Sequence, residues 1–244
     1  LGFLVFYISQ ASLKVKNLVV RESETALTTG LSLDSMSTVE LENLQFTNLV
    51  SNSGFGAGLQ VSFDSNTKNP KFLLTNSVFT SCKSKTFTGG AIYATFSVNP
   101  VNFQVSNCVF KQNYSATGGS SIFIEATLIF LTGSKINNCS FSENTDKANG
   151  TLTVMLSSEL TVENCRFSKH KAASSVIFTV LISETSVFTV MNSKLTENSG
   201  VAVISVKGVN TQARMDLNAV TIENNANGLS LLFEVGSCSI KNCE

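Results

Sequence analysis

The sequence predicts an all-β fold, a right-handed parallel β-helix of about eight coils with 24–33 residues each, on the strength of three observations. A short motif, in which a large apolar residue stands three positions after an asparagine, recurs along the whole chain. Between its copies lie runs of four to eight residues rich in Val, Ile, Phe, Thr and Leu, which favour strands. The spacing of the copies varies, as expected for a solenoid whose coils carry loops of different length.

The clearest copy of the motif is Asn107-Cys-Val-Phe110, followed by Asn113 and by a pair of glycines. Its first residue has counterparts at Asn17, Asn43, Asn76, Asn138, Asn164, Asn192, Asn218 and Asn242. Because the copies extend along the chain, we expect residues 1–244 to form a single β-helix domain. The last copy is unfinished and the chain does not begin with Met, so we expect a fragment of a longer repeat protein.

The handedness follows from the connections between strands. Crossovers between parallel strands are overwhelmingly right-handed, whereas left-handed β-helices favour a strict short period that this chain lacks. The two prolines, Pro70 and Pro100, lie between copies, where no ladder donor is needed. The apolar residues 1–8 are too few to span a bilayer and lack a basic leader, so we expect a first strand or half-coil instead of a signal peptide.

The composition excludes one class of partner. The 17 basic and 17 acidic residues cancel, and Lys and Arg are scattered, so we expect no nucleic-acid binding. A hydrophobic content of 43% with 14% charged residues suits strands that are buried on one face. We expect no membrane span in this segment.

Strand alternation assigns the faces of the motif. If Phe110 points into the coil, Cys108 does so too, whereas Asn107 and Val109 point outward. Stacked copies then form a column of large core side chains: Phe46, Phe79, Phe110, Phe141, Phe167, Leu195 and Ile222. Beside it runs a column of small side chains: Ser77, Cys108, Cys139, Cys165, Ser193, Ala219 and Cys243. Large and small columns side by side fill an interior at native density.

A second asparagine follows the large apolar residue, where the coil must turn. These residues form the expected corner ladder: Asn48, Asn113, Asn144, Asn198 and Asn225. Asparagine tolerates the left-handed conformation and bonds readily to nearby backbone, which explains its use at a repeated corner. His170 takes the same place in its own copy, and we interpret it as a turn substitute.

The motifs resemble those of known surface proteins. Phe110-Lys-Gln-Asn113 and Phe141-Ser-Glu-Asn144, with Gly89-Gly-Ala-Ile92, resemble the FxxN and GGA(I/L/V) repeats of the chlamydial polymorphic outer-membrane proteins. The Asn-Cys-x-Phe coils are also similar to repeats in surface proteins of ciliates and other protists. The chlamydial proteins are β-helix passengers of autotransporters that act as adhesins, so the resemblance implies a surface-exposed β-helix.

The cysteines allow two interpretations. Cys108, Cys139, Cys165 and Cys243 share one column, and parallel stacking leaves neighbouring Cβ atoms about 4.8 Å apart, beyond the usual disulfide range. We therefore favour a stack of reduced thiols, with a bridge from Cys139 to Cys108 or Cys165 as the alternative. Cys238 and Cys243 are close in sequence and are a candidate disulfide. No CxxC pair with metal spacing occurs, so we expect no metal site and no cofactor.

Three sequons are candidates for N-glycosylation if the protein is secreted by a eukaryote. Asn113 and Asn149 are expected in turns and are the better candidates, whereas Asn138 is expected in the packed motif.

The functional prediction is an extracellular or cell-surface structural protein: a filament subunit, stalk or spacer built by coil stacking. Its partners would be its own copies end to end, or further coils of the same chain. The alternative is an adhesin that binds carbohydrate, with Tyr114 and Lys147 on candidate loops. A polysaccharide lyase or hydrolase would need paired carboxylates, and the sequence offers no Asp-Asp pair, so we expect no enzyme and no catalytic residue.

Overall fold

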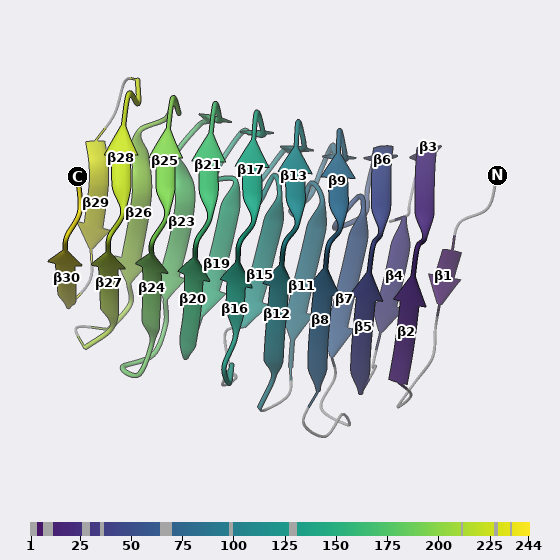
Figure 1. Ribbon diagram of the computed structural model, residues 1–244, viewed down its shortest axis with the longest axis horizontal. Helices are drawn as coiled ribbons and strands as arrows, with labels where there is room; N and C mark the ends of the chain where they lie inside the picture. The colour runs from purple at the N-terminus through teal and green to yellow at the C-terminus, as the bar shows by residue number, and fades with distance from the viewer. Residues whose placement is uncertain are drawn as a thin grey trace.

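The computed structural model describes residues 4–6, 12–25, 30–34, 37–63, 70–97, 100–126, 131–210, 212–226, 229–234 and 236–244. Over these residues the chain winds into a right-handed parallel β-helix, as the repeats predicted, and it contains no helix that could cross a membrane (Figure 1). Of the predicted opening strand, residues 4–6 form β1, and the remainder of residues 1–8 lies outside the described ranges.

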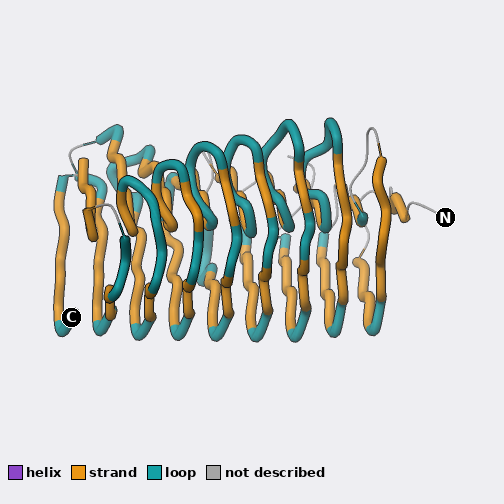
Figure 2. Tube along the Cα trace, turned by 90° about the horizontal axis from the view of Figure 1, so that it is seen from above, coloured by secondary structure: helices purple, strands orange, loops and turns teal. Residues whose placement is uncertain are grey.

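Three parallel sheets, which we call A, B and C, form the walls of the helix (Figure 2). Each coil contributes strands to them in this order. Sheet A consists of β1 (Leu4–Phe6), β4 (Leu31–Asp34), β7 (Leu59–Phe63), β11 (Ile92–Phe96), β15 (Ile122–Ala126), β19 (Leu152–Leu156), β23 (Ser175–Leu181), β26 (Ala202–Gly208) and β29 (Leu229–Glu234). Sheet B consists of β2 (Ser12–Lys16), β5 (Thr38–Glu42), β8 (Lys71–Thr75), β12 (Asn102–Ser106), β16 (Lys135–Asn137), β20 (Glu159–Glu163), β24 (Val187–Met191), β27 (Arg214–Asn218) and β30 (Ser237–Lys241).

Sheet C is divided lengthwise by a bend. Its first row consists of β3 (Val19–Thr25), β6 (Gln45–Ser51), β9 (Val78–Thr80), β13 (Val109–Lys111), β17 (Ser140–Ser142), β21 (Arg166–Ser168), β25 (Lys194–Thr196) and β28 (Thr221–Glu223). Its second row continues from the end of β6 through β10 (Lys83–Ser84), β14 (Tyr114–Ser115), β18 (Thr145–Asp146) and β22 (Lys171–Ala172).

The corner between sheets B and C is made by the first asparagine of the motif. At this residue φ is between +49° and +58° in every motif copy. In the copy that we expected to begin at Asn218, the corner falls on Ala219 instead, so Val220, which is buried, takes the place in the column of small side chains that the sequence assigned to Ala219. Asparagine is the side chain that best tolerates this left-handed region, which explains why the corner recurs. Alternation still holds across the corner, since Cys108 is buried and Val109 is 37% exposed, as predicted.

The connection from sheet C back to sheet A is crowded where glycines occur. A Cβ on Gly90 would lie 2.2 Å from the carbonyl oxygen of Ser120 in the next coil, so no other residue fits there. Loops of this kind are visible along one side of the trace (Figure 2).

Candidate functional site

The large apolar side chains form a continuous column inside the helix. The rings of Phe46, Phe79, Phe110, Phe141 and Phe167 stack with centroid separations of 4.8, 5.2, 4.9 and 4.4 Å. Leu195 extends the column as a fully buried residue, and Ile222 is half-buried at its end. Offset ring pairs add stability beyond burial alone, so this column stabilises the stacking of each coil on the next.

The second asparagine of the motif has an interior role that differs from the expected corner. Asn113, Asn144 and Asn198 are at most 1% exposed, and Asn225 is half-buried. Each amide holds the preceding coil twice: Asn144 Oδ1 accepts from the backbone N–H of Asn113 at 2.8 Å, and its Nδ2 donates to Phe110 O at 3.0 Å. The same pair of bonds recurs at the other three positions. We call this set the amide ladder.

Asn48 does not belong to the amide ladder. It is exposed, has φ +55°, and stands only two positions after Phe46, so Leu49 occupies the ladder position in that coil. The bend that divides sheet C lies at this position in the coils from Asn48 to Asn224, and other residue types occupy it later, such as Gln112 and Glu143. The prediction was wrong because two neighbouring sites both favour asparagine, one for its backbone conformation and one for its amide.

Two other residue types take the place of asparagine in the ladder. Cys82 has no side-chain amide, but its Sγ lies 3.7 Å from Phe46 O, the carbonyl oxygen to which an asparagine at this position would donate. His170 Nδ1 accepts from the N–H of Asn144 at 3.1 Å, while its buried Nε2 faces Phe141 without a hydrogen bond of normal geometry. Burial lowers the pKa of His170 to about 3, so the imidazole is neutral and is committed to the interior.

The cysteine column consists of thiols in the structure. Cys108, Cys139 and Cys165 are buried and unbridged, and each Sγ lies 3.2 Å from the carbonyl oxygen two residues earlier. Ser193, in the same column, makes the equivalent bond and also accepts from the N–H of Cys165 at 3.0 Å. The neighbouring Cys108 thiol and burial together raise the pKa of Cys139 to about 12, which removes its nucleophilicity.

The candidate disulfide between Cys238 and Cys243 is not formed. Both are free thiols, Cys238 exposed and Cys243 half-buried. β30 is extended from Ser237 to Lys241, and Asn242 then turns the chain, so Cys243 begins the next wall of the coil. An extended strand separates residues by about 3.3 Å each, which keeps the two sulfurs apart.

The structure reverses the expected order of the sequons. Asn113 is 1% exposed, and its amide is bonded within the ladder, so it is no acceptor for a glycan. Asn138 is exposed at a corner, where its Nδ2 donates to Asn107 Oδ1. Asn149 is half-buried in a loop.

A buried carboxyl follows three serines in one column of sheet C. Asp146 aligns with Ser84 and Ser115 across the short strands of sheet C and is 3% exposed. Neither carboxyl oxygen makes a hydrogen bond of normal geometry, although the backbone N–H groups of Ala173 and Ala148 lie close enough to favour ionisation slightly. Burial dominates and raises the pKa of Asp146 to about 7.

The loop residues considered for adhesion differ in exposure. Tyr114 is half-buried in β14, with Lys83 Nζ 5.0 Å from the centre of its ring, and Lys147 is exposed. A larger aromatic group, which no motif predicts, lies against the outer face of sheet A: the rings of Phe55, Tyr93 and Phe123 follow one another at 4.6 and 5.7 Å, with Phe55 half-buried and the other two buried. The Tyr93 hydroxyl donates to Glu125 at 2.8 Å.

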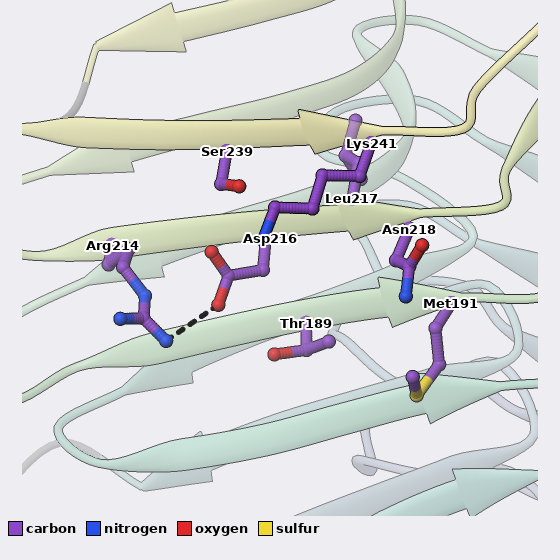
Figure 3. A pocket seen from close by; sticks show the side chains of 8 residues that line it. All are labelled: Thr189, Met191, Arg214, Asp216, Leu217, Asn218, Ser239 and Lys241. Atoms are coloured by element: carbon purple, nitrogen blue, oxygen red, sulfur yellow. Dashed lines mark ion pairs between the residues drawn. The ribbon is translucent and has the colours of Figure 1, made fainter.

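A hollow of about 360 Å³ lies on the outer face of sheet B (Figure 3). Its lining residues come from three neighbouring strands: Thr189 and Met191 of β24; Arg214, Asp216, Leu217 and Asn218 of β27; and Ser239 and Lys241 of β30. Arg214 and Asp216 form an ion pair of 2.7 Å at one side. No motif marks these residues, because the hollow depends on how side chains from three coils meet. Among the described residues, no group of three or more His, Cys, Asp or Glu side chains could hold a metal ion.

Comparison with known proteins gives one match. A family model described as "Right handed beta helix region" matches residues 4–244, which covers the sheets from β1 to β30. No curated protein and no solved structure matches the chain.

Proposed function

Because the chain belongs to the right-handed β-helix family, we propose that it is an extracellular or cell-surface structural repeat protein that serves as a stiff spacer, stalk or filament subunit. The observation that supports this proposal is that the motif residues are used for holding one coil to the next. The amide ladder, the ring column and the thiol column all lie in the interior and connect successive coils. An interior in which successive coils are bonded to one another resists bending, which is what a spacer requires.

The outer surface of the walls supports the same proposal. Lysine and glutamate side chains pair between neighbouring coils, as in Lys14–Glu40 at 2.8 Å and in Lys135–Glu163. Exposed pairs contribute little each, about 0.2–1 kcal/mol, but they follow the stacking direction. The buried His170 and Asp146 have interior roles, so we propose no catalytic activity for this segment.

Electron microscopy of the native material tests the proposal. Filaments with an axial repeat set by whole coils, about 4.8 Å each, would support assembly of copies end to end. Single particles tethered to a membrane or wall would exclude the filament form and leave the stalk or spacer. Cleavage of an acidic or neutral polysaccharide by the purified protein would overturn the structural assignment.

The second candidate function is an adhesin that binds carbohydrate. It is favoured by the resemblance of the repeats to those of surface adhesins and by Phe55, a half-buried ring that stacks on Tyr93, whereas Tyr93 and Phe123 themselves are buried. A glycan array probed with the protein and with the variant Phe55→Ala tests it, since sugar stacking on an aromatic face requires the ring. Binding of the variant equal to that of the wild type would remove this face from consideration.

A further inference from the structure

The thiols of the cysteine column form a continuous buried row. The registers of β13, β17 and β21 place Cys108, Cys139 and Cys165 one above another in successive coils. All three are between 1% and 3% exposed, and the Cys139 thiol is within hydrogen-bonding reach of the thiols of both neighbours. The column does not need sulfur in order to pack, because Ser193 fills the same place in the next coil and bonds to the carbonyl oxygen two residues earlier in the same way.

Two sulfurs of the row also face backbone donors. The N–H of Cys108 points to Cys139 Sγ, and the N–H of Cys139 points to Cys165 Sγ. The next coil shows the same arrangement with oxygen, since Ser193 Oγ accepts from the N–H of Cys165 at 3.0 Å. A hydrogen bond to sulfur favours the thiolate over the thiol. Cys139 and Cys165 therefore have the donors that two neighbouring thiolates need.

The spacing of the row suits a metal ion in line between two sulfurs better than a disulfide. A disulfide needs sulfurs about 2.05 Å apart and Cβ atoms about 3.5–4.5 Å apart, whereas neighbouring strands lie about 4.8 Å apart. The bond from Zn²⁺ to a thiolate is about 2.3 Å long, and two such bonds in line span about 4.6 Å. Sulfurs in a row cannot surround one ion, so the ion must be one that two ligands satisfy.

We propose that Cys139 and Cys165 bind one Cu(I) ion as a linear dithiolate. Cu(I) has the same number of electrons as Zn²⁺ but is softer, is selected by thiolates and is satisfied by two sulfurs in line. Binding releases both thiol protons to solvent and transfers no electron, so the bound unit carries one negative charge. The N–H groups of Cys108 and Cys139 stabilise this charge. Each ligand directly follows an exposed corner residue, Asn138 or Asn164, which gives the ion a short path from solvent.

Competition for Cu(I) with bathocuproine disulfonate, a coloured chelator, tests the proposal on the full chain under anaerobic, reducing conditions. The exposed Cys238 and the half-buried Cys243 are first replaced by serine, so that their thiols do not take up the ion. We expect one Cu(I) per chain, with two sulfur neighbours by X-ray absorption spectroscopy. Zn²⁺ should not bind, because it requires four ligands at tetrahedral positions.

Serine variants identify the ligands. Serine is the matched replacement, because the column already contains it at Ser77 and Ser193. Cys139→Ser and Cys165→Ser should each weaken Cu(I) binding about hundredfold or more, since loss of a ligand costs at least as much as loss of a residue that orients one. Cys108→Ser changes an equally buried thiol of the same row and should leave the affinity unchanged.

Thermal unfolding separates binding by the folded protein from binding by the thiols of the unfolded chain. An ion that binds the folded state raises the unfolding temperature, whereas one that prefers the unfolded state lowers it. We expect Cu(I) to raise the unfolding temperature of the parent protein and of Cys108→Ser, and to have no such effect on Cys139→Ser or Cys165→Ser.

The outcomes decide the proposal. One Cu(I) per chain that is lost in Cys139→Ser and Cys165→Ser, kept in Cys108→Ser and accompanied by a higher unfolding temperature establishes the site. Absence of binding, retention in either ligand variant, equal loss in all three variants, or a lowered unfolding temperature would overturn it. None of these results bears on the structural role proposed above, which does not depend on a metal ion.

Discussion

The single histidine in the amide ladder should make the protein sensitive to acid, and replacing it with the ladder's usual residue should remove that sensitivity. In the variant His170→Asn, the new amide can donate to Phe141 O, which Nε2 of the imidazole does not reach with normal geometry. Near pH 8 we expect the free energy of unfolding to change by no more than about 1 kcal/mol, since a gained hydrogen bond is offset by a smaller side chain.

The magnitude of the acid effect follows from the two pKa values of His170. Its pKa is about 3 in the folded protein and 6.5 ordinarily, so the unfolded chain binds a proton first as the pH falls. The contribution of the neutral His170 to the free energy of unfolding is fully present above about pH 6.5 and is lost toward pH 3. At pH 4 the unfolded state gains about 3 kcal/mol from this proton relative to pH 8. The variant has no such titrating group, so its free energy of unfolding relative to that of the wild type should rise by about 3 kcal/mol from pH 8 to pH 4.

Urea unfolding followed by circular dichroism at several pH values measures the difference between the two proteins. Solenoids can unfold in parts, so a local measurement is also needed. Hydrogen exchange of the backbone N–H of Asn144, which donates to His170 Nδ1, provides it. The matched control introduces Asn113→His into the variant and should restore the acid sensitivity in a different coil. A stability difference between wild type and His170→Asn that stays constant from pH 8 to pH 4 would refute the reasoning.

Three further predictions concern other buried groups. The pKa of Asp146 is raised from 3.8 to about 7, so the folded protein loses stability relative to the unfolded chain as the pH rises through this window. Asp146→Ser should therefore raise the free energy of unfolding near pH 8 by up to about 4 kcal/mol and leave it unchanged near pH 3.5. Urea titrations at the two pH values measure this difference. A thiol reagent at mildly alkaline pH should label the exposed Cys238 in the folded protein and the buried Cys139 only after unfolding, which peptide mass spectrometry reads directly. Expression in a glycosylating secretory host should modify Asn138 and leave Asn113 free, and detection of a glycan on Asn113 would contradict its place in the ladder.

The sequence predicted the columns well because identical layers impose their own register. Once Phe110 is placed inward, its counterparts must stack on it, and the structure pairs Phe110 with Phe79 and Phe141. The same reasoning failed at Asn48, since the exposed bend and the buried ladder stand one position apart and both accept asparagine. Spacing alone could not tell which of the two a given asparagine serves.

The hollow and the aromatic group could not be predicted for a different reason. Each depends on side chains from several coils at positions where the repeat places no fixed residue type. Thr189, Asp216 and Ser239 of the hollow's lining, for example, form one row across three strands. Such a site is a property of the stacked rows and becomes visible only when their register is known.

The amide ladder has a direction, and this bears on how the helix is assembled. Both bonds of Asn144 reach the coil before it, to the N–H of Asn113 and to Phe110 O, and Asn198 likewise reaches back to His170 and Phe167. Each asparagine of the ladder therefore binds its coil to the coil that precedes it. A chain that emerges N-terminus first from a ribosome or a secretion channel can fasten every new coil as soon as its asparagine arrives, without waiting for later sequence. The helix can then form coil by coil, and the folded coils serve as the template for the next coil.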